Sequence, residues 1–414
     1  MGKLLRVWTA FRLAYHSGQT ISMHMDGAKL HMDYSNIYTR DELGLSIFSV
    51  RQNMTKKYGI IGCGMMGVEH IKNLNLLDGA EVYAVYDPVR NLAEAAAQLA
   101  GCDMVTSSIK ALVSLPELDA VVVVSPNFRH VEHLEEISAH CDLPILCEKP
   151  LYTHPNQEAR LDRIIARHKA PIWVAMEYRY MPPITQMAEQ ADEVTGGVKL
   201  LTIKEHRIPF LPKIGDWNRF NENTGGTLVE KCCHFFDLMR FITQSEPIRV
   251  SASAGQIVNH LDEAYDGKVP DIWDGGYVIF DFANGARSML ELCMFADGTL
   301  WNEEISAVGP KGKIECRMPG PHRFWPSDIG PPPESQITIA PRHPKRPVTK
   351  DILIDHSLLM AGDHHASTFF QHEKFLQVLH GNGKVEVSVD DGRKAVKMGL
   401  AAQQAAREHR VVSL

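Results

Sequence analysis

Short apolar runs alternate with amphipathic stretches between residues 58 and 147 of the chain. The spacing of Ile71, Leu74 and Leu77 puts apolar side chains on one helical face, whereas residues 118–124 are almost continuously apolar. A run of that kind is typical of a parallel strand that is covered on both faces. The predicted strands are 58–61, 81–86, 118–124 and 144–147, and the predicted helices are 68–77, 91–100 and 130–140. The alternation predicts an α/β fold with a doubly wound, parallel Rossmann-type sheet.

The second half of the chain has a different pattern, which predicts an antiparallel sheet. Residues 277–282 and 286–295 both suit strands, and Asn284-Gly285 lies between them. Asn-Gly between two such runs is a strong signal for a tight hairpin turn. Another strand is expected to begin near Glu304.

Composition and charge restrict the class of protein. Of the 414 residues, 44% are apolar and 22% are charged, which excludes a disordered, collagen-like or small disulfide-stapled chain. The 43 basic and 50 acidic side chains leave a net charge of −7, which argues against a nucleic-acid partner. No apolar run reaches the roughly 18 residues of a membrane-spanning helix, so no membrane partner is expected. The eight cysteines are scattered without a C-x-x-C pair, so we expect reduced thiols and a cytoplasmic protein.

Residues 1–55 differ from the rest and are interpreted as an extension of unknown role. Lys3, Arg6 and Arg12 precede the first acidic residue, Asp26, which is compatible with an organelle-targeting segment. The alternatives are a loosely ordered extension and a start codon assigned too far upstream, since Met54 stands just before the first predicted strand. No chemistry is assigned to this region.

A glycine-rich motif follows the first predicted strand directly. Gly62, Gly64 and Gly67 form a G-x-G-x-x-G pattern, and Asp87 ends the second predicted strand. In such a motif the first glycine permits a tight turn, the second lets the backbone approach a pyrophosphate, and the third lets helix and strand pack closely. Free N–H groups at the helix N-terminus favour the negative charge. The motif in this context predicts a dinucleotide-binding domain.

Asp87 favours NAD over NADP as the cofactor. Its carboxylate can accept hydrogen bonds from a ribose diol and would repel a 2′-phosphate. Arg90 offers an alternative, because it could hold a 2′-phosphate, although a solvated arginine at a helix start is the preferred interpretation. Further cofactor contacts are expected within the glycine motif and at the carboxyl ends of later strands. These candidates are Met65, Met66, Ser125, Asn127, His130, Glu148 and Lys149.

Five motifs in the same order resemble the Gfo/Idh/MocA family, the group of glucose–fructose oxidoreductase and inositol dehydrogenase, over about residues 57–414. They are Gly62-x-Gly64-x-x-Gly67 with His70, Glu148-Lys149-Pro150, Arg179-Tyr180-x-Pro182, Gly225-Gly226-Thr227-Leu228 with His234 and Asp237, and the tail from Val387 to Ala402. The resemblance implies a Rossmann domain at 56–177. It also implies a substrate-binding and oligomerisation domain at 178–414, with an open and mostly antiparallel sheet. The implied reaction is NAD(P)-dependent oxidation of a hydroxyl on a sugar, cyclitol or related small molecule, by a homodimer or homotetramer.

Lys149 and His234 are the candidate catalytic residues. Lys149 follows a predicted parallel strand, and an ammonium there can hydrogen-bond a substrate oxygen. The residues alone leave a surface lysine as the alternative, and the resemblance implies the catalytic role. Residues 227–241 suit one helix, on which Glu230, His234 and Asp237 share a face. A neutral imidazole can accept the proton of a hydroxyl, and the resemblance implies this role for His234 and a substrate contact for Glu230.

The chain departs from the family pattern at the helix that carries His234. The family usually has Asp where Glu230 stands and Gly where Cys232 stands, and Lys231 is also unusual. Glu230 is longer than aspartate by one methylene, so we expect a pocket for a different hydroxyl pattern from that of inositol dehydrogenases. Aromatic and polar residues in or near the loop before this helix suit a sugar ring and are further substrate-binding candidates. They are Tyr180, Trp217, Arg219 and Asn223.

No metal site is expected from the sequence. Cys232, Cys233 and His234 are adjacent, so their side chains cannot all converge on one helix face, and no second ligand pair has the spacing of a zinc site. The cluster Asp363-His364-His365 is interpreted as a polar turn before a predicted helix at 369–379.

Three functions remain open at this point. The leading hypothesis is an NAD-dependent dehydrogenase of a polyhydroxylated ring. The second is an enzyme that keeps the nucleotide bound and oxidises and re-reduces its substrate within one cycle, as in glycoside cleavage or sugar transhydrogenation. The third is a non-catalytic, nucleotide-sensing regulator on the same fold, which would not need Lys149.

Overall fold

The computed structural model describes residues 22–25, 28–31 and 55–414, and the chain divides into two units at residues 1–52 and 53–414. In the first unit, β1 (Ser22–Met25) pairs with β2 (Ala28–His31) as an antiparallel hairpin. The interpretations of a targeting segment and of a start at Met54 fall outside the described residues.

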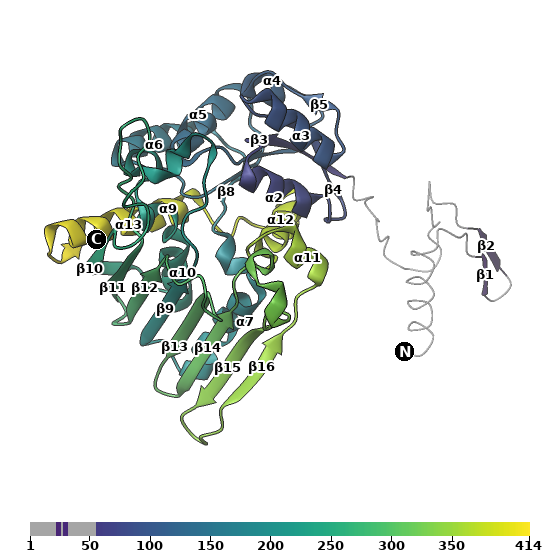
Figure 1. Cartoon of the computed structure of the whole chain (residues 1–414). Helices are drawn as coiled ribbons and strands as arrows, with labels where there is room; N and C mark the ends of the chain where they lie inside the picture. Colours follow the sequence, from purple (N-terminus) through teal and green to yellow (C-terminus); the bar gives the residue numbers. More distant parts are fainter. Residues whose placement is uncertain (1–21, 26–27, 32–54) are drawn as a thin grey trace. The chain divides into compact units, whose positions relative to one another are not determined.

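Six parallel strands form the first sheet of the larger unit, in the order β5-β4-β3-β6-β7-β8 (Figure 1). The strands are β3 (Lys56–Ile61), β4 (Ala80–Tyr86), β5 (Met104–Val105), β6 (Ala120–Val123), β7 (Ile145–Cys147) and β8 (Ile172–Val174). The helices between them are α2 (Met65–Leu74), α3 (Arg90–Ala100), α4 (Ile109–Val113), α5 (His130–His140) and α6 (Glu158–Arg167). The strand order reverses between β3 and β6, the point at which such sheets bind cofactors. The predicted doubly wound, parallel sheet is therefore confirmed.

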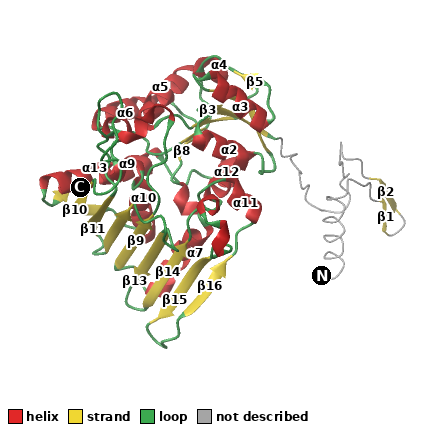
Figure 2. Ribbon diagram, viewed as in Figure 1, coloured by secondary structure: helices red, strands yellow, loops and turns green. Residues whose placement is uncertain are grey.

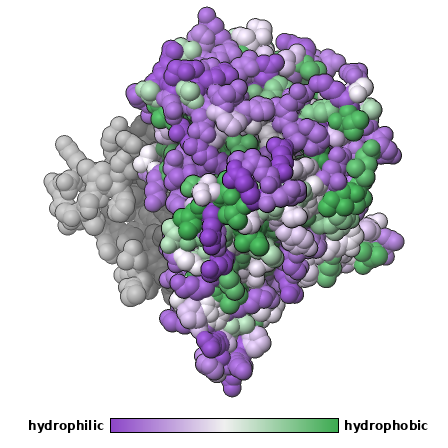
Figure 3. Space-filling view, turned by 90° about the vertical axis from the view of Figure 1, so that its left-hand side faces the viewer, coloured by the Kyte–Doolittle hydropathy of each residue, from purple (hydrophilic) through white to green (hydrophobic). Residues whose placement is uncertain are grey.

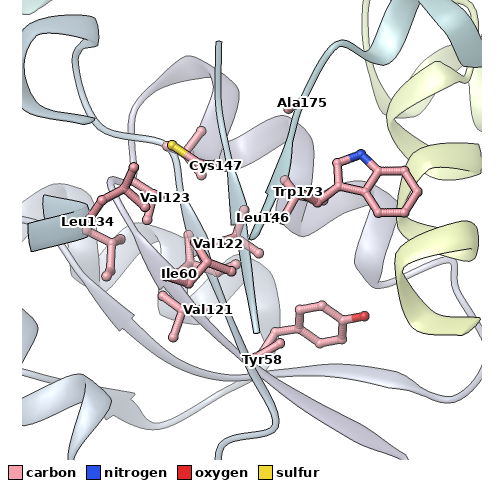
Figure 4. Packing of buried hydrophobic residues seen from close by; sticks show 14 of the residues in the cluster. Tyr58, Ile60, Val121, Val122, Val123, Leu134, Leu146, Cys147, Trp173 and Ala175 are labelled. Atoms are coloured by element: carbon pink, nitrogen blue, oxygen red, sulfur yellow. The ribbon is translucent and has the colours of Figure 1, made fainter. Parts of the chain in front are cut away.

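Apolar side chains of neighbouring strands pack beside one another in this sheet (Figure 4). Ile60 pairs with Val122, and Val122 pairs with Leu146, in the parallel register of β3, β6 and β7. All three side chains are fully buried. Burial of each contributes about 1.5–3 kcal/mol to the free energy of unfolding. Cover on both faces of the sheet explains the continuous apolar run at residues 118–124.

The end of the chain returns to the first sheet through α12 (Ser367–Leu379), which packs on α2. Phe375 of α12 lies edge-on to Trp173 of β8, with ring centroids 6.1 Å apart. The amide of Val174 donates to the carbonyl oxygen of Val387 at 3.0 Å. This segment therefore contributes to the core of the first sheet, although the proposed boundary after residue 177 assigns it to the second domain. The hydrophobic pattern predicts a helix here without indicating which sheet covers its apolar face.

Nine strands form the second sheet, in the order β16-β15-β14-β13-β9-β12-β11-β10-β17 (Figure 2). They are β9 (Leu200–His206), β10 (Pro247–Gly255), β11 (Gly275–Phe282), β12 (Arg287–Cys293), β13 (Glu303–Val308), β14 (Gly312–Met318), β15 (Ser335–Pro341), β16 (Val348–Ile352) and β17 (Val412–Ser413). Neighbouring strands are antiparallel except for the pair β9 and β12. The predicted hairpin joins β11 and β12 through Asn284 and Gly285, where Gly285 has a φ of +81°. The expected mostly antiparallel sheet is confirmed.

Helices cover one face of the second sheet. The helices that contact its strands include α7 (Pro182–Thr195), α10 (Cys233–Thr243) and α13 (Val389–Glu408). The shorter helices of this half are α8 (Asn221–Thr224), α9 (Thr227–Glu230) and α11 (His356–Ala361). On β11, Val278 and Phe280 are buried, whereas Tyr277 and Ile279 on the other face are 53% and 46% exposed. Figure 3 shows one side of the molecule, on which hydrophilic residues predominate and hydrophobic residues form separate patches. Within the described ranges, no helix is both long and apolar enough to cross a membrane.

Candidate active site

The glycine loop between β3 and α2 has the geometry that a dinucleotide site needs. Gly62 has a φ of +102°, and a Cβ there would lie 2.6 Å from the carbonyl oxygen of Val124. A Cβ on Gly67 would lie 2.2 Å from the carbonyl oxygen of Gly62. A Cβ on Gly64 would meet nothing within 4 Å, and this residue lines an open cleft at the N-terminus of α2. The first glycine is thus required by conformation, and the third by packing. The second leaves space for a ligand.

Two backbone amides hold the carboxylate of Asp87 at the end of β4. Cys63 donates to Oδ2 and Val89 donates to Oδ1, each at 2.8 Å. Asp87 lines the cleft, whereas Arg90 does not. Arg90 is exposed and pairs with Glu94 on the surface of α3, with 2.7 Å between Nε and Oε1. The fixed charge beside the cleft at this strand end is therefore negative.

A cleft of about 450 Å³ lies at the carboxyl ends of β3, β4 and β6. Two buried polar side chains that line it, Ser125 through Oγ and Asn127 through Nδ2, have no hydrogen-bond partner among the described residues. Such groups are uncommon in proteins because they have lost their bonds to water. The open helix N-terminus, the carboxylate of Asp87 and these two orphaned groups fit a bound dinucleotide.

Two buried histidines form hydrogen bonds with segments that line this cleft. In His130, Nδ1 lies 2.7 Å from the carbonyl oxygen of Pro150 and Nε2 lies 2.9 Å from that of Ser125. In His70, Nε2 lies 3.1 Å from Oε1 of Glu148. His130 and Glu148 both line the cleft. Because both ring nitrogens of His130 face backbone carbonyls, this residue positions the two loops instead of offering a free nitrogen to a cofactor.

The cleft meets a second, smaller pocket. Four residues line both cavities, namely Met66, Lys149, Lys213 and Glu230. Nζ of Lys149 lies 3.4 Å from the backbone oxygen of Glu230. Met65, a candidate cofactor contact, lines the second pocket and not the cleft. Lys149 therefore stands where a molecule in the cleft would come close to a molecule in the pocket.

Lys149 is a partly buried cation at this junction. Burial opposes its charge, but the sulfur of Cys233 and the carboxylates of Glu148, Glu230 and Glu177 outweigh burial and raise the pKa of Lys149 above its usual value. The side chain is therefore an ammonium group near neutral pH. It can donate hydrogen bonds to an oxygen atom in the pocket.

His234 lines the second pocket as a neutral imidazole. The residue is 2% exposed, and burial, together with the charges of Lys149 and Lys231, lowers the pKa of His234 well below its usual value. The ring of Tyr178 stacks on the imidazole, with centroids 4.1 Å apart and planes at 12°. Nδ1 of His234 has no hydrogen-bond partner in the described part of the chain. A neutral imidazole in this position can accept a proton.

The prediction of one continuous helix at 227–241 is wrong. The helix is broken between α9 and α10, so Glu230 ends the first helix and His234 belongs to the second. Both residues line the second pocket, but Asp237 does not. The carboxylate of Asp237 accepts two hydrogen bonds of 2.6 Å from Arg179. Of the three residues expected to share one helix face, only Glu230 and His234 therefore line the same pocket.

The unusual Lys231 lies at the break between the two helices. Its side chain is buried, and Nζ lies 2.5 Å from the hydroxyl oxygen of Tyr178 and 2.9 Å from Oε1 of Glu205. Burial lowers the pKa of Lys231, although Glu205 acts against this. A buried ammonium costs free energy unless its hydrogens are bonded. The bonds to Tyr178 and Glu205 therefore stabilise the buried ammonium of Lys231 between α9 and α10.

The second pocket is rich in charged side chains. Its glutamates are Glu69, Glu177, Glu205, Glu230 and Glu303, and its basic residues are Lys149, Lys213, Lys231, Arg207, His234 and His364. Burial and the neighbouring Glu205 raise the pKa of Glu303 to about 8, so its carboxyl group is largely protonated at neutral pH. A wall of many donors and acceptors suits a ligand with several hydroxyl groups.

Four predicted substrate contacts lie elsewhere. Tyr180 is a buried core residue, and Arg219 is buried with Nε 3.2 Å from Oε2 of Glu263. Asn223 donates to the carbonyl oxygen of Trp217 at 3.1 Å, and Trp217 itself lines the cofactor cleft. None of the four lines the second pocket. Closeness in sequence to the His234 helix does not determine the direction of these side chains, so a substrate contact by any of the four remains a prediction.

Sequence reasoning missed several residues of the pocket, namely Tyr178, Lys213, Arg207, Glu205, Glu303 and His364. The strand pattern held a signal for two of them. Glu205 and Glu303 face each other at inward positions of β9 and β13, which otherwise hold apolar residues. A carboxylate at an inward-facing, buried position of a strand indicates either a functional site or a charged or hydrogen-bonded partner. Lys213 lies in an irregular loop, where no periodicity marks it.

Two family models match the chain. One, described as an oxidoreductase family with an NAD-binding Rossmann fold, matches residues 56–176. The other, described as the C-terminal alpha/beta domain of an oxidoreductase family, matches residues 191–414. Both models carry the name GFO_IDH_MocA, and together they cover most of the chain.

Individual relatives agree with these models. The inositol 2-dehydrogenase of Rhizobium meliloti strain 1021 is 25% identical over 363 residues, which are 87% of this chain and 100% of the relative. The inositol 2-dehydrogenase 2 of Saccharopolyspora erythraea is 29% identical over 271 residues, which are 64% of this chain and 74% of the relative. A solved structure of levoglucosan dehydrogenase in complex with NADH aligns with a TM-score of 0.72 at 19% identity, over 86% of this chain and 98% of that one. At that identity the likeness concerns the fold.

Proposed function

Since the chain belongs to the Gfo/Idh/MocA family of oxidoreductases and has an NAD-binding Rossmann fold, we propose that it is a dehydrogenase of a polyhydroxylated ring. It oxidises a hydroxyl of a cyclitol, sugar or related small molecule by reversible, NAD-dependent hydride transfer. Relatives that are named inositol 2-dehydrogenases support a cyclitol as the first substrate class to test.

The meeting of the two cavities at Lys149 is the observation that carries this proposal. The cofactor cleft and the second pocket share Lys149 and Glu230, and His234 lines the pocket beyond them. A hydride can pass only between groups in contact, so a dehydrogenase needs its cofactor and substrate sites to meet. The polar wall of the pocket supports a hydroxyl-rich substrate.

The side chains at the junction suit the two tasks that alcohol oxidation gives to a protein. When bound, NAD supplies the hydride acceptor. His234, neutral because it is buried, accepts the proton that the hydroxyl loses. Lys149, kept charged by its carboxylate neighbours, donates a hydrogen bond to the same oxygen and stabilises its developing negative charge. Glu230 accepts a hydrogen bond from a neighbouring hydroxyl and so orients the ring.

NAD is the preferred cofactor in this proposal. Asp87 is fixed by two amides at the end of β4, where a ribose diol can donate to its carboxylate. A 2′-phosphate would meet this negative charge. Arg90, which could have compensated for it, is paired with Glu94 on the helix surface.

The test follows the absorbance of reduced nicotinamide with the full-length protein, using NAD and NADP separately. The substrates are myo-inositol, its isomers, common aldoses and their glycosides. We expect steady reduction of NAD with at least one cyclitol or sugar. A burst of one reduced nicotinamide per chain without turnover would support the bound-nucleotide mechanism instead. Cofactor binding without any reduction across the panel would contradict the proposed substrate class.

The assembly remains a prediction. One face of the second sheet carries exposed apolar residues such as Tyr277 and Ile279 and is not covered by the helices that pack on the other face. We expect a homodimer or homotetramer to use this face, and light scattering of the purified protein measures its mass. A monomer at micromolar concentration would contradict this expectation.

A further inference from the structure

Three side chains of metal-ligand type meet at the wall of the second pocket, apart from the pair Lys149 and His234 that carries the proposed reaction. Glu69 lies in α2, Glu177 begins the short helix η3 (Glu177–Tyr180), and His364 precedes α12. One carboxylate oxygen of each glutamate and one imidazole nitrogen all lie within 4.8 Å of one another. Nδ1 of His364 is 2.8 Å from Oε1 of Glu69 and 3.5 Å from Oε1 of Glu177.

These distances match the spacing of ligands around one ion. Ligand atoms about 2.1 Å from a cation and separated by angles between octahedral and tetrahedral values lie about 3.0–3.4 Å from each other. The two measured distances from His364 bracket that range. Since all three ligand atoms lie within 4.8 Å of one another, the three side chains can adjust to contact a single cation.

One oxygen of the Glu177 carboxylate has no hydrogen bond within the described part of the chain, and Nδ1 of His364 lies 3.5 Å from it. The residue is fully buried, and its Oε1 has no hydrogen-bond partner among the described residues. The hydroxyl of Thr368 lies 2.6 Å from Oε2 of Glu177 and 3.1 Å from Oε1 of Glu69. A hydroxyl has one proton, so Thr368 serves one carboxylate at a time. A cation between the carboxylates would give the orphaned oxygen a partner.

Gly362 makes room for one of these carboxylates. Its φ of −166° is extended backbone that any residue adopts, so the conformation does not require glycine. A Cβ at this position would lie 2.3 Å from Oε1 of Glu69. The loop before α12 is therefore shaped around the oxygen that faces His364.

The cluster is open toward the pocket. Glu69, Glu177 and His364 all line it, and the imidazole of His364 has its centroid 5.9 Å from that of the Tyr178 ring, which also stacks on His234. Three protein ligands with an open side are characteristic of a metal site that can take water or another oxygen ligand.

We propose that Glu69, Glu177 and His364 bind one divalent transition-metal cation, Zn²⁺ or Mn²⁺, at the wall of the second pocket. An imidazole with two carboxylates suits these ions better than Mg²⁺, which prefers oxygen ligands and retains its waters. The open positions of the ion face the pocket, where water or hydroxyl oxygens complete its shell. This site replaces the interpretation of residues 363–365 as only a polar turn and the expectation that the chain has no metal site.

The test measures metal binding and not activity, so its outcome is independent of the dehydrogenase proposal. Full-length protein is stripped with a chelator, dialysed and titrated with Mn²⁺, and free Mn²⁺ is followed by electron paramagnetic resonance. Calorimetry with Zn²⁺ and with Mg²⁺ complements this titration. We expect one tightly bound Mn²⁺ per chain, displaced by Zn²⁺. Absence of stoichiometric binding, or binding of Mg²⁺ alone, would overturn the proposal.

A pair of variants ties the ion to this site. Glu177→Gln keeps an acceptor for Thr368 and is expected to fold, but to bind Mn²⁺ at least roughly 100-fold more weakly. Glu193→Gln, on the exposed side of α7, is the matched control and should bind as the wild type does. If Glu177→Gln proves unstable in thermal unfolding, Glu69→Gln gives the same test. Wild-type affinity in the folded ligand variant, or equal loss in the control, contradicts the site.

Discussion

The imidazole of His234 lies face to face with the ring of Tyr178, with centroids 4.1 Å apart. The hydroxyl of Tyr178 in turn lies 2.5 Å from Nζ of Lys231. A buried ammonium thus lies at the hydroxyl of the ring that stacks on the imidazole, and the cation favours the neutral form of the histidine. Burial and charge together prepare His234 to accept a proton at neutral pH.

Replacement of His234 by asparagine tests the role of this imidazole. We expect His234→Asn to lower kcat for alcohol oxidation by roughly 100- to 10,000-fold, because the hydroxyl proton loses its acceptor. His409→Asn, at an exposed helix end, is the control and should leave kcat unchanged. Equal kinetics in the two variants would show that His234 is not the acceptor.

The pH profile gives a second check on His234. A base works only when it is unprotonated, so the rate falls as the pH drops through its pKa. Because burial holds the pKa of His234 well below its usual value, the acid limb of kcat/KM should lie below about pH 6.5. The profile is measured over a pH range in which circular dichroism shows the protein folded. An acid limb at or above neutral pH would contradict the assigned protonation state.

Cofactor choice depends on Asp87. Asp87→Ser removes the charge that meets a 2′-phosphate, and we expect the ratio of kcat/KM for NAD to that for NADP to fall by roughly tenfold or more. The carboxylate also accepts the amides of Cys63 and Val89, so the melting temperature must be measured alongside. An unchanged ratio in a folded variant would remove Asp87 as the determinant.

The glycine loop offers a matched pair of substitutions. Gly67→Ala places a Cβ 2.2 Å from the backbone oxygen of Gly62, and we expect a loss of about 1–3 kcal/mol in the free energy of unfolding. Gly64→Ala meets no protein atom within 4 Å and should fold normally. It should nevertheless bind NADH more weakly, because its methyl group projects into the cleft. Denaturant unfolding and calorimetry with NADH measure both, and normal NADH affinity in Gly64→Ala would count against this cofactor position.

Substitutions of Tyr178 and Tyr180 compare a tyrosine that lines the second pocket with one that is buried in the core. Tyr178→Phe removes a hydrogen-bond partner of buried Lys231 beside the stacked imidazole of His234, and we expect this disturbance of the pocket to lower kcat/KM by about tenfold. Tyr180→Phe should leave kcat/KM unchanged, because the Tyr180 hydroxyl is buried without a partner and lies outside the pocket. Steady-state kinetics of both variants decide this, and the reverse order of effects would restore Tyr180 as a substrate contact.

The hydrophobic pattern predicted the elements of the first sheet better than their boundaries. β6 (Ala120–Val123) lies within the predicted strand 118–124, whose apolar run is continuous because both faces are covered. The glycine motif is placed by the strand and helix on either side of it. The two-residue strand β5 was not predicted, because so short a run has no period. The partner of α12 was also not predictable, because an apolar helix face does not indicate which sheet will cover it.

The candidate site could be predicted only where a motif fixed the position of a side chain. Lys149 is the second residue after the end of β7, so its place at the sheet edge follows from the strand. Tyr180 and Arg219 instead turn away from the pocket, because side-chain direction in an irregular segment depends on contacts that the sequence does not show. The cluster of Glu69, Glu177 and His364 comes from three distant segments, and only the fold brings them together.

The central claim is that a carbon bearing a hydroxyl gives its hydride to NAD at the junction beside Lys149. The most direct measurement uses the cyclitol or sugar of the panel that reduces NAD, deuterated at its ring carbons, and follows deuterium in the reduced nicotinamide by mass spectrometry. The wild type and the exposed-lysine control Lys169→Ala should both transfer one deuterium to each nicotinamide, whereas Lys149→Ala should transfer almost none. Reduced nicotinamide without deuterium, or equal transfer by Lys149→Ala, would contradict the account.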